Sequence, residues 1–356
     1  MAQWVKPEYR KGKIDRAGRL LLPWWTGGPN CPSPDNLGEL WGIIQNWRTS
    51  HALPLNVFQA GLRKRAKKID PDVIVAQRLK RLSSLLNKLA RHPHMKLSQM
   101  QDLGGCRAIL SNINAVDQLY DVYRGDPLLL PEETSLKCYD YIRRPKTDGY
   151  RGIHVVGRYD ARKETRADWN GHRIEIQLRS HLQHAFATAV ETVTTFTRTP
   201  LKFGAGPTGW RRFFSLVGSA FADRENTPLV KGTPRNQHEL IAELKERTKE
   251  LRVFHRLSGW TNVLQSLPID VTQQPIRWLL LVLDIKKKTI DVTAYYDSKV
   301  ASEELAQLER PAGGDTDAVL VWVPSIKQLR TAYPNYYADT EEFLTQLKMV
   351  LDGKIG

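Results

Sequence analysis

The sequence has few cysteines and no long apolar runs, and both absences exclude whole classes of protein. Cys31, Cys106 and Cys138 are the three cysteines in 356 residues, which make neither a disulfide framework nor a metal knuckle. The longest apolar runs, at 278–285 and 318–323, fall far short of the ~20 residues that a membrane-spanning helix needs. The first residues also lack the apolar core of a signal peptide. We therefore expect a cytoplasmic protein in a reducing compartment, with no membrane partner.

Charge is distributed unevenly along the chain. The whole sequence has 53 Lys and Arg against 38 Asp and Glu, a net charge of +15. Residues 236–356 hold 15 basic and 17 acidic side chains, whereas residues 1–235 hold 38 basic and 21 acidic ones, a net of +17. A part this basic attracts polyphosphates, either a nucleotide or a nucleic acid. The alternative is that the charge serves solubility alone.

Residues 1–197 have the pattern of a helical beginning followed by alternating strands and helices. The stretch 1–36 is rich in proline and glycine and predicts an irregular arm. Asp70-Pro71-Asp72 is typical of a helix start and predicts one long helix that reaches about Arg91. Apolar periodicity predicts further helices over 37–49, 54–68, 115–124 and 181–197, and strands over 105–112, 136–144, 152–160 and 173–180.

The last part of the chain has a rhythm of its own. A helix is expected over 239–257, and the order ββαβα follows, with strands over 276–284, 289–296 and 318–324 and helices over 301–309 and 339–351. We therefore predict an α/β (α+β) protein of three units, a first domain at 1–235, a helical linker at 236–270 and a small separate module at 271–356.

The strand expected over 173–180 carries side chains suited to chemistry. Alternation places the apolar residues from Ile174 to Leu178 on one face, and Glu175 and Gln177 on the other. A solvated antiparallel strand would show the same pattern. The nearby basic turn at 143–146 instead favours a carboxylate among cations, which is typical of Mg²⁺ bound with a nucleoside triphosphate.

Asp102 is a second carboxylate, placed at the entrance of another expected strand. The paired glycines Gly104-Gly105 let backbone approach closely there. Two carboxylates with several Arg and Lys fit Mg²⁺-assisted phosphoryl transfer, although Asp102 alone could equally cap a turn or a helix. In the expected helix that ends at Arg91, Arg78 falls near the edge of the apolar stripe, which favours an arginine reaching into a cleft.

Four ordered motifs between Arg78 and Glu191 resemble the RelA/SpoT nucleotide pyrophosphokinases, the family of ppGpp synthetases. They are RLKRLSSLLNK from Arg78, DLGGCR from Asp102, YIRRPKTDGYRGIH from Tyr141 and EIQLR from Glu175. The resemblance implies a mixed β-sheet flanked by helices, related to nucleotidyltransferases. It also implies an enzyme that transfers pyrophosphate from ATP to an acceptor hydroxyl, with AMP as the leaving group.

The same resemblance implies a role for each motif residue. Asp102 and Glu175 would hold Mg²⁺, and Glu175 would also deprotonate the acceptor hydroxyl. Tyr150 would stack on the acceptor base as the third catalytic residue, with Lys146 and His154 beside it. ATP would be bound by Arg78, Lys80, Lys88, Arg107, Gln177 and Arg179.

The whole length is similar to the toxic small alarmone synthetases, above all to the CapRel group of fused toxin and antitoxin proteins in phage defence. The likeness rests on HAFATAVETVTTF from His184 and YPNYYADT from Tyr333. It implies that the C-terminal module is a pseudo-zinc-finger, and no cysteine or histidine follows His255. The module would inhibit the enzyme through Tyr333, Tyr336 and Tyr337 until it senses a phage protein, with a capsid protein expected. The three tyrosines could instead form the core of the module. The resemblance also implies that the chain is bacterial or prophage-encoded and that it is a monomer or weak oligomer.

The group's acceptor is the 3′ end of tRNA, and its modification inhibits translation. The basic first part of this chain favours tRNA over a lone nucleotide. The predicted tRNA contacts lie in the helix expected over 54–68, where the alternative is a solvated helix face; they are Arg63, Lys64, Arg65, Lys67 and Lys68. Two other functions stay open, an alarmone synthetase that makes (p)ppGpp or (p)ppApp, and a catalytically silent sensor of nucleotide or RNA.

Overall fold

A β-sheet forms the centre of the computed structural model, which describes residues 4–125, 137–197, 208–257, 278–284, 287, 289–295, 298–309, 316–322 and 340–353. The strands are β1 (Ile74–Leu79), β2 (Gly104–Leu110), β3 (Cys138–Asp140), β4 (Ile153–Arg158), β5 (Arg173–Ser180), β6 (Trp278–Asp284), β7 (Thr289–Tyr295) and β8 (Thr316–Trp322). They lie in the order β3-β4-β5-β2-β1-β8-β6-β7. Only the pair β2 and β5 is parallel among these neighbours, so the predicted mixed sheet of an α/β fold is confirmed.

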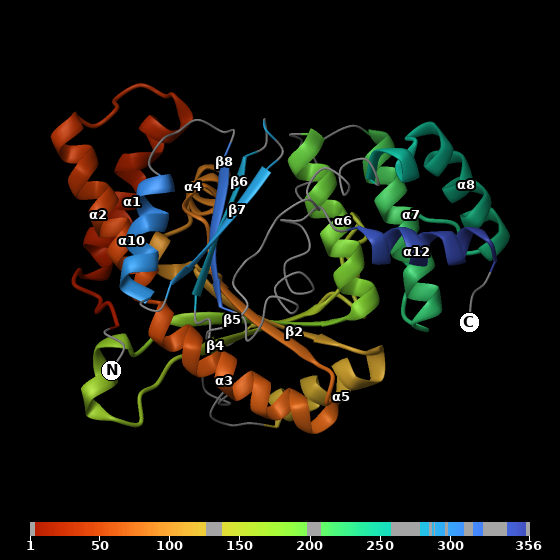
Figure 1. Cartoon of the computed structure of the whole chain (residues 1–356), viewed down its shortest axis with the longest axis horizontal. Helices are drawn as coiled ribbons and strands as arrows, with labels where there is room; N and C mark the ends of the chain where they lie inside the picture. The colour runs from red at the N-terminus through yellow and green to blue at the C-terminus, as the bar shows by residue number, and fades with distance from the viewer. Residues whose placement is uncertain are drawn as a thin grey trace.

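Helices flank this sheet in groups (Figure 1), and each group has its own apolar core. One group, α3 (Ala52–Ile69) and α5 (Ile113–Arg124), covers one face of the sheet. A second group packs around the start of the chain and consists of α1 (Lys11–Thr26), α2 (Pro34–Thr49) and α4 (Leu82–Arg91). A third group consists of α6 (His181–Thr197), α7 (Thr208–Arg224), α8 (Gln237–Glu250) and α12 (Glu341–Leu351). Smaller elements are α10 (Ser298–Glu309) and the 3₁₀ turns η1 (Leu97–Gln99) and η2 (Glu164–Trp169).

Most of the predicted elements are confirmed, and β3 is shorter than expected. Helices α2, α3, α5 and α6 and strands β2, β4 and β5 lie where periodicity placed them. The strand predicted over 136–144 ends at Asp140, because the Asp140 carboxylate accepts hydrogen bonds from the backbone N–H groups of Ile142 at 3.0 Å and Arg143 at 2.9 Å. These bonds turn the chain away from the sheet.

The irregular arm predicted over 1–36 was wrong, because residues 11–26 form helix α1. Its buried side chains include Ile14, Ala17 and Leu21, which share one helical face. Pro23 lies in the last turn, and Gly27 ends the helix with a left-handed φ of 69°. The proline and glycine that suggested an arm therefore mark only the end of a helix.

The long helix predicted from Asp70 to about Arg91 was also wrong. Residues 74–79 form strand β1, and helix α4 begins only at Leu82. The Asp70 carboxylate accepts hydrogen bonds from the backbone N–H and the hydroxyl of Ser111, at 2.7 and 2.9 Å, and so ties the start of β1 to the end of β2. Pairing with β2 along all six residues of β1 outweighs the local preference for a helix.

The predicted order ββαβα of the C-terminal segment is present as β6, β7, α10, β8 and α12. Strand β8 pairs with β1, so these strands extend the central sheet (Figure 1). Helix α12 lies apart from them and packs in the core of the third helix group. The boundaries at 235 and 270 and the pseudo-zinc-finger shape of the module stay predictions. None of the helices in the described ranges has the length and apolar character needed to span a membrane.

Candidate active site

Strand β5 has one apolar face and one polar face, as its sequence predicts. Ile174, Ile176 and Leu178 are fully buried in the core under α3 and α5. Glu175 and Gln177 alternate with them and line a pocket on the opposite face of the sheet. The strand thus presents a carboxylate to a cavity while its other face anchors it in the core.

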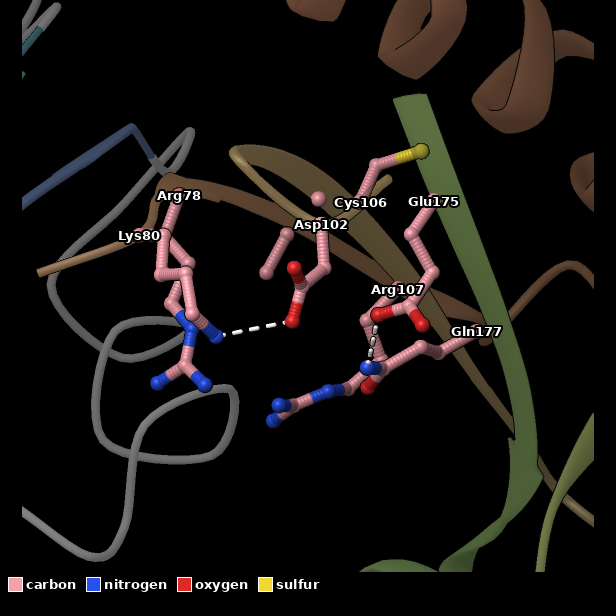
Figure 2. A pocket seen from close by; sticks show the side chains of 9 residues that line it. Arg78, Lys80, Asp102, Cys106, Arg107, Glu175 and Gln177 are labelled. Carbon is pink, nitrogen blue, oxygen red and sulfur yellow. Dashed lines mark hydrogen bonds and ion pairs between the residues drawn. The ribbon is translucent and has the colours of Figure 1, made fainter. Parts of the chain in front are cut away.

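The pocket collects most of the predicted ATP and metal residues from three neighbouring strands (Figure 2). Arg78 and Lys80 come from the end of β1, Asp102 and Arg107 from the entrance and middle of β2, and Glu175 and Gln177 from β5. The remaining lining residues are Ala76, Gly105 and Cys106. Residues 74–79 form a strand and not the predicted helix, but alternate residues of a strand share a face. Arg78 and Lys80 therefore still lie on the same side.

Asp102 is held by two lysines. Its carboxylate oxygens lie 2.7 Å from Nζ of Lys80 and 2.9 Å from Nζ of Lys88, which reaches in from α4. Burial by itself would raise the pKa of Asp102, but the two ammonium groups outweigh it and hold that pKa below its usual value. For Lys80 burial wins, and its pKa is lowered although Asp102 pulls it upward. Asp102 therefore neutralises cations that a triphosphate would meet.

Glu175 is held by a different pair of partners. The amide of Gln177 donates to one Glu175 oxygen at 2.6 Å, and Nδ1 of His154 lies 2.9 Å from the other. Burial opposes ionisation, but His154 and Gln177 together hold the pKa of Glu175 far below its usual range. Glu175 is therefore a stable carboxylate at neutral pH.

Tyr150 continues this network away from Glu175. Its hydroxyl lies 2.6 Å from Nε2 of His154, and Arg179 donates to it at 2.7 Å. Burial would raise the pKa of Tyr150, but Arg179 and His154 lower it to about 8. Burial would lower the pKa of His154, but Tyr150 and Glu175 raise it to about 9. Tyr150, His154 and Glu175 form one hydrogen-bonded chain that ends at a carboxylate of the pocket.

Lys146 and a neighbouring tyrosine complete the predicted acceptor side. The Lys146 ammonium lies 4.2 Å from the ring centroid of Tyr141 and 5.1 Å from that of Tyr150. Tyr141 in turn stacks on Tyr139, with the ring centroids 5.9 Å apart and the planes 8° from parallel. Our sequence reasoning missed Tyr139 and Tyr141 as site residues. Their spacing of two in a strand-like stretch is the signal that would have placed both rings on one side.

Arg48 is a second residue that our sequence reasoning missed. It is only 1% exposed, and its Nε donates to the backbone carbonyl of Lys80 at 2.7 Å. Arg48 lies on α2, far from any motif, so no local pattern singles it out. It fixes the backbone from which Lys80 reaches Asp102.

The donor set of the pocket fits a magnesium ion bound together with a nucleotide. Asp102 and Glu175 line the same cavity, and the Glu175 carboxylate acts to raise the pKa of Asp102, as a second carboxylate in a shared site does. No cluster of three or more His, Cys, Asp or Glu suited to a metal occurs among the described residues. Mg²⁺ is commonly held by one or two carboxylates plus substrate phosphates, so two protein ligands suffice here.

Cys106 lines the pocket but takes no part in the cation cluster. Figure 2 shows its sulfur pointing away from Arg78 and Lys80, and the side chain belongs to the core beneath α3. Burial raises the pKa of this thiol, which keeps it protonated and unreactive.

The structure does not bring the predicted tRNA contacts to the pocket. Helix α3 lies against one face of the sheet (Figure 1), where Ile174 and Ile176 are buried, whereas Glu175 alternates with them and lines the pocket on the other face. Lys64, Lys67 and Lys68 are exposed on it, whereas Arg63 is half-buried and Arg65 lies over the ring of Tyr123 at 5.5 Å. An acceptor that touched both α3 and Glu175 would have to pass around the edge of the sheet. The predicted inhibitory residues Tyr333, Tyr336 and Tyr337 lie outside the described residues.

Comparison with known proteins points to one family. Residues 77–197 match the family model described as "Region found in RelA / SpoT proteins". Among solved structures, the small alarmone synthetase 1 of Bacillus subtilis bound to its product pppGpp is 18% identical, with a TM-score of 0.41 over 49% of this chain and 89% of that one. A GTP pyrophosphokinase family protein from Streptococcus pneumoniae is 19% identical, with a TM-score of 0.39 over 57% of this chain and 93% of that one. No curated protein matches the chain. All the residues that line the pocket, except Ala76, fall inside residues 77–197, the segment that matches this family model (the RelA/SpoT region).

Proposed function

We propose that this chain is an ATP-dependent pyrophosphokinase of the RelA/SpoT type. One observation carries the proposal: a pocket inside the RelA/SpoT region holds two carboxylates, Asp102 and Glu175, among the cations Arg78, Lys80 and Arg107. Such a set suits the phosphates of ATP, because phosphoryl transfer depends mainly on positioning and on neutralising charge.

The ATP side consists of the basic residues around Asp102. Arg78, Lys80, Lys88 and Arg107 would bind the phosphates, and Asp102 with Glu175 would hold Mg²⁺. When bound, the ion supplies further positive charge to the phosphate oxygens. Before ATP binds, the Asp102 carboxylate balances the charge of Lys80 and Lys88 and keeps them ordered. When ATP binds, the two lysines exchange this carboxylate for phosphate oxygens.

The acceptor side consists of Tyr150, Lys146 and His154. An acceptor base stacks on Tyr150, and the acceptor hydroxyl attacks the β-phosphorus of ATP. The bond between the α-phosphate and the β-phosphorus breaks, AMP leaves, and pyrophosphate is transferred. Because Glu175 has a pKa far below neutral, it is a weak base. It accepts a hydrogen bond from the acceptor hydroxyl and orients it, and the proton moves to Glu175 as the bond from the hydroxyl oxygen to the β-phosphorus forms.

The acceptor that we propose first is the 3′ end of tRNA, so that the reaction inhibits translation. The net charge of +17 on residues 1–235 supports a polyanionic partner. The alternative is synthesis of (p)ppGpp or (p)ppApp from a guanine or adenine nucleotide. The match of residues 77–197 to the RelA/SpoT family model supports both acceptors equally.

We also propose that the C-terminal segment inhibits the enzyme in cis and that a phage protein, a capsid protein in our expectation, releases it. What supports this is the pairing of β8 with β1, which sets Val321 opposite Arg78 and Trp322 opposite Gln77. A change in the position of β8 would therefore reach the strand that carries two ATP-binding side chains.

The experiment that tests the activity uses full-length protein and ATP labelled with radioactive phosphorus at the γ position. It offers tRNA, or GDP, GTP and AMP, as acceptors. We expect weak label on tRNA with the wild type, because the C-terminal segment inhibits it, and stronger label with full-length Tyr336→Ala. We expect none when Glu175→Gln is added to Tyr336→Ala, because this change keeps the shape of the side chain and removes its charge. Label on a mononucleotide only would assign the chain to the alarmone synthetases. No transfer to any acceptor by the wild type or by Tyr336→Ala, with ATP binding retained, would favour the silent sensor.

A second measurement separates the two acceptors by salt. A tRNA site that contacts roughly 6 to 10 phosphates loses affinity steeply as salt rises, whereas a single nucleotide loses much less.

The triple change of Lys64, Lys67 and Lys68 to Glu tests the exposed side of α3. A raised KM for tRNA with an unchanged KM for ATP supports tRNA contact there, and unchanged values for both place the tRNA elsewhere.

A further inference from the structure

The acceptor loop, residues 146–152, packs against a helix that lies outside the RelA/SpoT region. Gly149 of the loop and Gly218 of α7 are in backbone contact. A methyl group on Gly218 would lie 2.6 Å from Cα and 2.8 Å from the carbonyl oxygen of Gly149. A methyl group on Gly149 would lie 2.4 Å from the carbonyl oxygen of Phe214, and the φ of Gly149 is +87°. Both positions therefore require glycine, one for space and the other for space and backbone conformation.

Hydrogen bonds fasten the loop to α7 on both sides of this contact. The Ser215 hydroxyl donates to the carbonyl of Thr147 at 2.6 Å. Arg151 is 3% exposed, and its Nε donates to the carbonyl of Gly218 at 3.1 Å. The same guanidinium donates to the carbonyl of Pro228, beyond the end of α7. A buried guanidinium must have hydrogen-bond partners, and here its partners are backbone carbonyls. These hydrogen bonds hold the loop, the helix α7 and the segment after it at fixed positions relative to one another.

This fastening determines where Tyr150 stands. Tyr150 lies between the two anchored residues Gly149 and Arg151, and its ring packs at the margin of the core of the third helix group. Its hydroxyl is the group that reaches His154. A shift of the loop along α7 would move the ring on which the acceptor base stacks, while the residues around Asp102 would stay in place.

Helix α7 is itself supported by the end of the chain. Phe343 of α12 is 1% exposed and lies against three phenylalanine rings of α7, with ring centroids 6.4 Å from Phe213, 6.3 Å from Phe214 and 5.9 Å from Phe221. Arg224 at the end of α7 donates to the side-chain oxygen of Gln346. The support of the acceptor loop thus runs from α12 through α7 to Gly149.

We propose that α7 is the positioning element for the acceptor, with Gly218 and Ser215 as its positioning residues and α12 as its brace. The inference rests on the proposed function, because it assigns the loop at 146–152 to the acceptor. It adds that two segments outside the RelA/SpoT region complete the acceptor half of the site, and that the ATP half is independent of them.

The test is the change Gly218→Ala in the full-length protein. Alanine is more favourable than glycine within a helix, so α7 is retained and the displacement falls on the loop. We expect KM for the acceptor to rise about tenfold or more, because a shift of about 1 Å in a positioned group costs that much. KM for ATP should stay within about twofold, since the ATP residues lie on or beside β1, β2, β5 and α4, and none of them lies on α7 or on the loop at 146–152. Ser215→Ala should raise the acceptor KM in the same direction by a smaller factor.

Gly209→Ala is the matched control, because it makes the same change in the same helix where a methyl group meets only Leu251 at 3.4 Å. It should leave both KM values unchanged. A second readout does not need activity: trypsin should cut faster after the exposed Lys146 in Gly218→Ala than in the wild type or the control, with the site identified by mass spectrometry.

The outcomes separate this inference from the proposed function. An acceptor KM unchanged in both Gly218→Ala and Ser215→Ala, or a joint rise of both KM values, would overturn it. If Gly218→Ala does not fold, Ser215→Ala decides. If the wild type transfers pyrophosphate to no acceptor, the proposed function fails, and the rate of cleavage after Lys146 alone decides whether α7 holds the loop.

Discussion

Two carboxylates face the same pocket, and their partners give them different chemistry. Asp102 is neutralised by two lysines, whereas Glu175 is hydrogen-bonded to a histidine and an amide. Asp102 therefore competes directly with phosphate for Lys80 and Lys88, and Glu175 does not. At the residue scale this difference makes separate predictions possible for the two groups.

Asp102→Asn should tighten the binding of metal-free ATP and at the same time slow transfer in the presence of Mg²⁺. The change releases Lys80 and Lys88 from their carboxylate, so ATP in EDTA should bind about threefold tighter or more. Loss of a magnesium ligand should lower kcat by about 10²-fold. Calorimetry in EDTA and steady-state kinetics check the two effects. Asp168→Asn, which removes an exposed ion pair with Lys6, is the control, and weaker metal-free binding in Asp102→Asn would contradict the assignment.

The raised pKa of His154 predicts that the free energy of unfolding depends on pH. Its pKa in the folded protein is about 9, above the value of about 6.5 in an unfolded chain, because Tyr150 and Glu175 outweigh burial. The folded state thus binds the proton more tightly, and this stabilisation is present below about pH 6.5 and lost as pH rises through about 9. In urea unfolding, the wild type should exceed His154→Gln in stability at pH 6, and the gap should shrink by pH 10. A gap of equal size at both pH values would contradict the shift, and exposed His255→Gln should show no gap.

At the element scale, the end of β1 positions two side chains of the proposed ATP site, Arg78 and Lys80. The carbonyl of Lys80 accepts from buried Arg48, and its N–H donates to the carbonyl of Leu103 at 2.7 Å. Lys80 is therefore held from both sides of its peptide, by α2 and by the entrance of β2. The pocket depends on α2 although none of its lining residues comes from that helix.

Arg48→Lys should raise KM for ATP and lower the free energy of unfolding by about 2 kcal/mol, because lysine cannot reproduce the bond from Nε while keeping the bond to Gln45. The acceptor KM should change little. Kinetics with both substrates and urea unfolding measure these effects. The control is Arg247→Lys, since the Arg247 ion pair with Glu250 lies on α8 away from the pocket. Equal rises in both KM values would mean that Arg48 stabilises the fold without positioning Lys80.

The elements also show what the sequence could predict. Strands β2, β4 and β5 were predicted correctly, because alternation and glycine placement are local signals. The assignment of β1 failed because residues 74–79 are defined by pairing with Gly104–Ile109, a contact that no local pattern reveals. Arg78 and Lys80 nevertheless both line the pocket, since the motif names them in either conformation. Arg48 and Gly218 could not be predicted, because their roles arise only from packing between distant segments.

At the scale of the whole molecule, the C-terminal segment enters the fold in two places. Strands β6 to β8 extend the sheet beyond β1, and α12 packs between α6 and α8 in the third helix group. Removing everything after residue 235 would expose the apolar residues that α8 and α12 cover, among them Phe213 and Phe214. Such a truncation would mix loss of inhibition with loss of core, so single substitutions are the better test of what the segment does.

Phe343→Ala and Tyr336→Ala should act in opposite directions if the segment both supports and inhibits the enzyme. Loss of the Phe343 ring from a closed aromatic core should cost about 3–5 kcal/mol of unfolding free energy and should lower transfer to the acceptor, since α7 loses its brace. Tyr336→Ala, and likewise Tyr337→Ala, should leave stability near wild type and raise transfer and toxicity to the host. Thermal unfolding, acceptor labelling and growth on induction measure the three effects, with Glu175→Gln added to show that toxicity requires catalysis. If Tyr336→Ala protein is harmless to the host and transfers at the wild-type rate, inhibition through that residue is excluded. If Phe343→Ala protein transfers at an increased rate, α12 restrains the acceptor loop and does not support it.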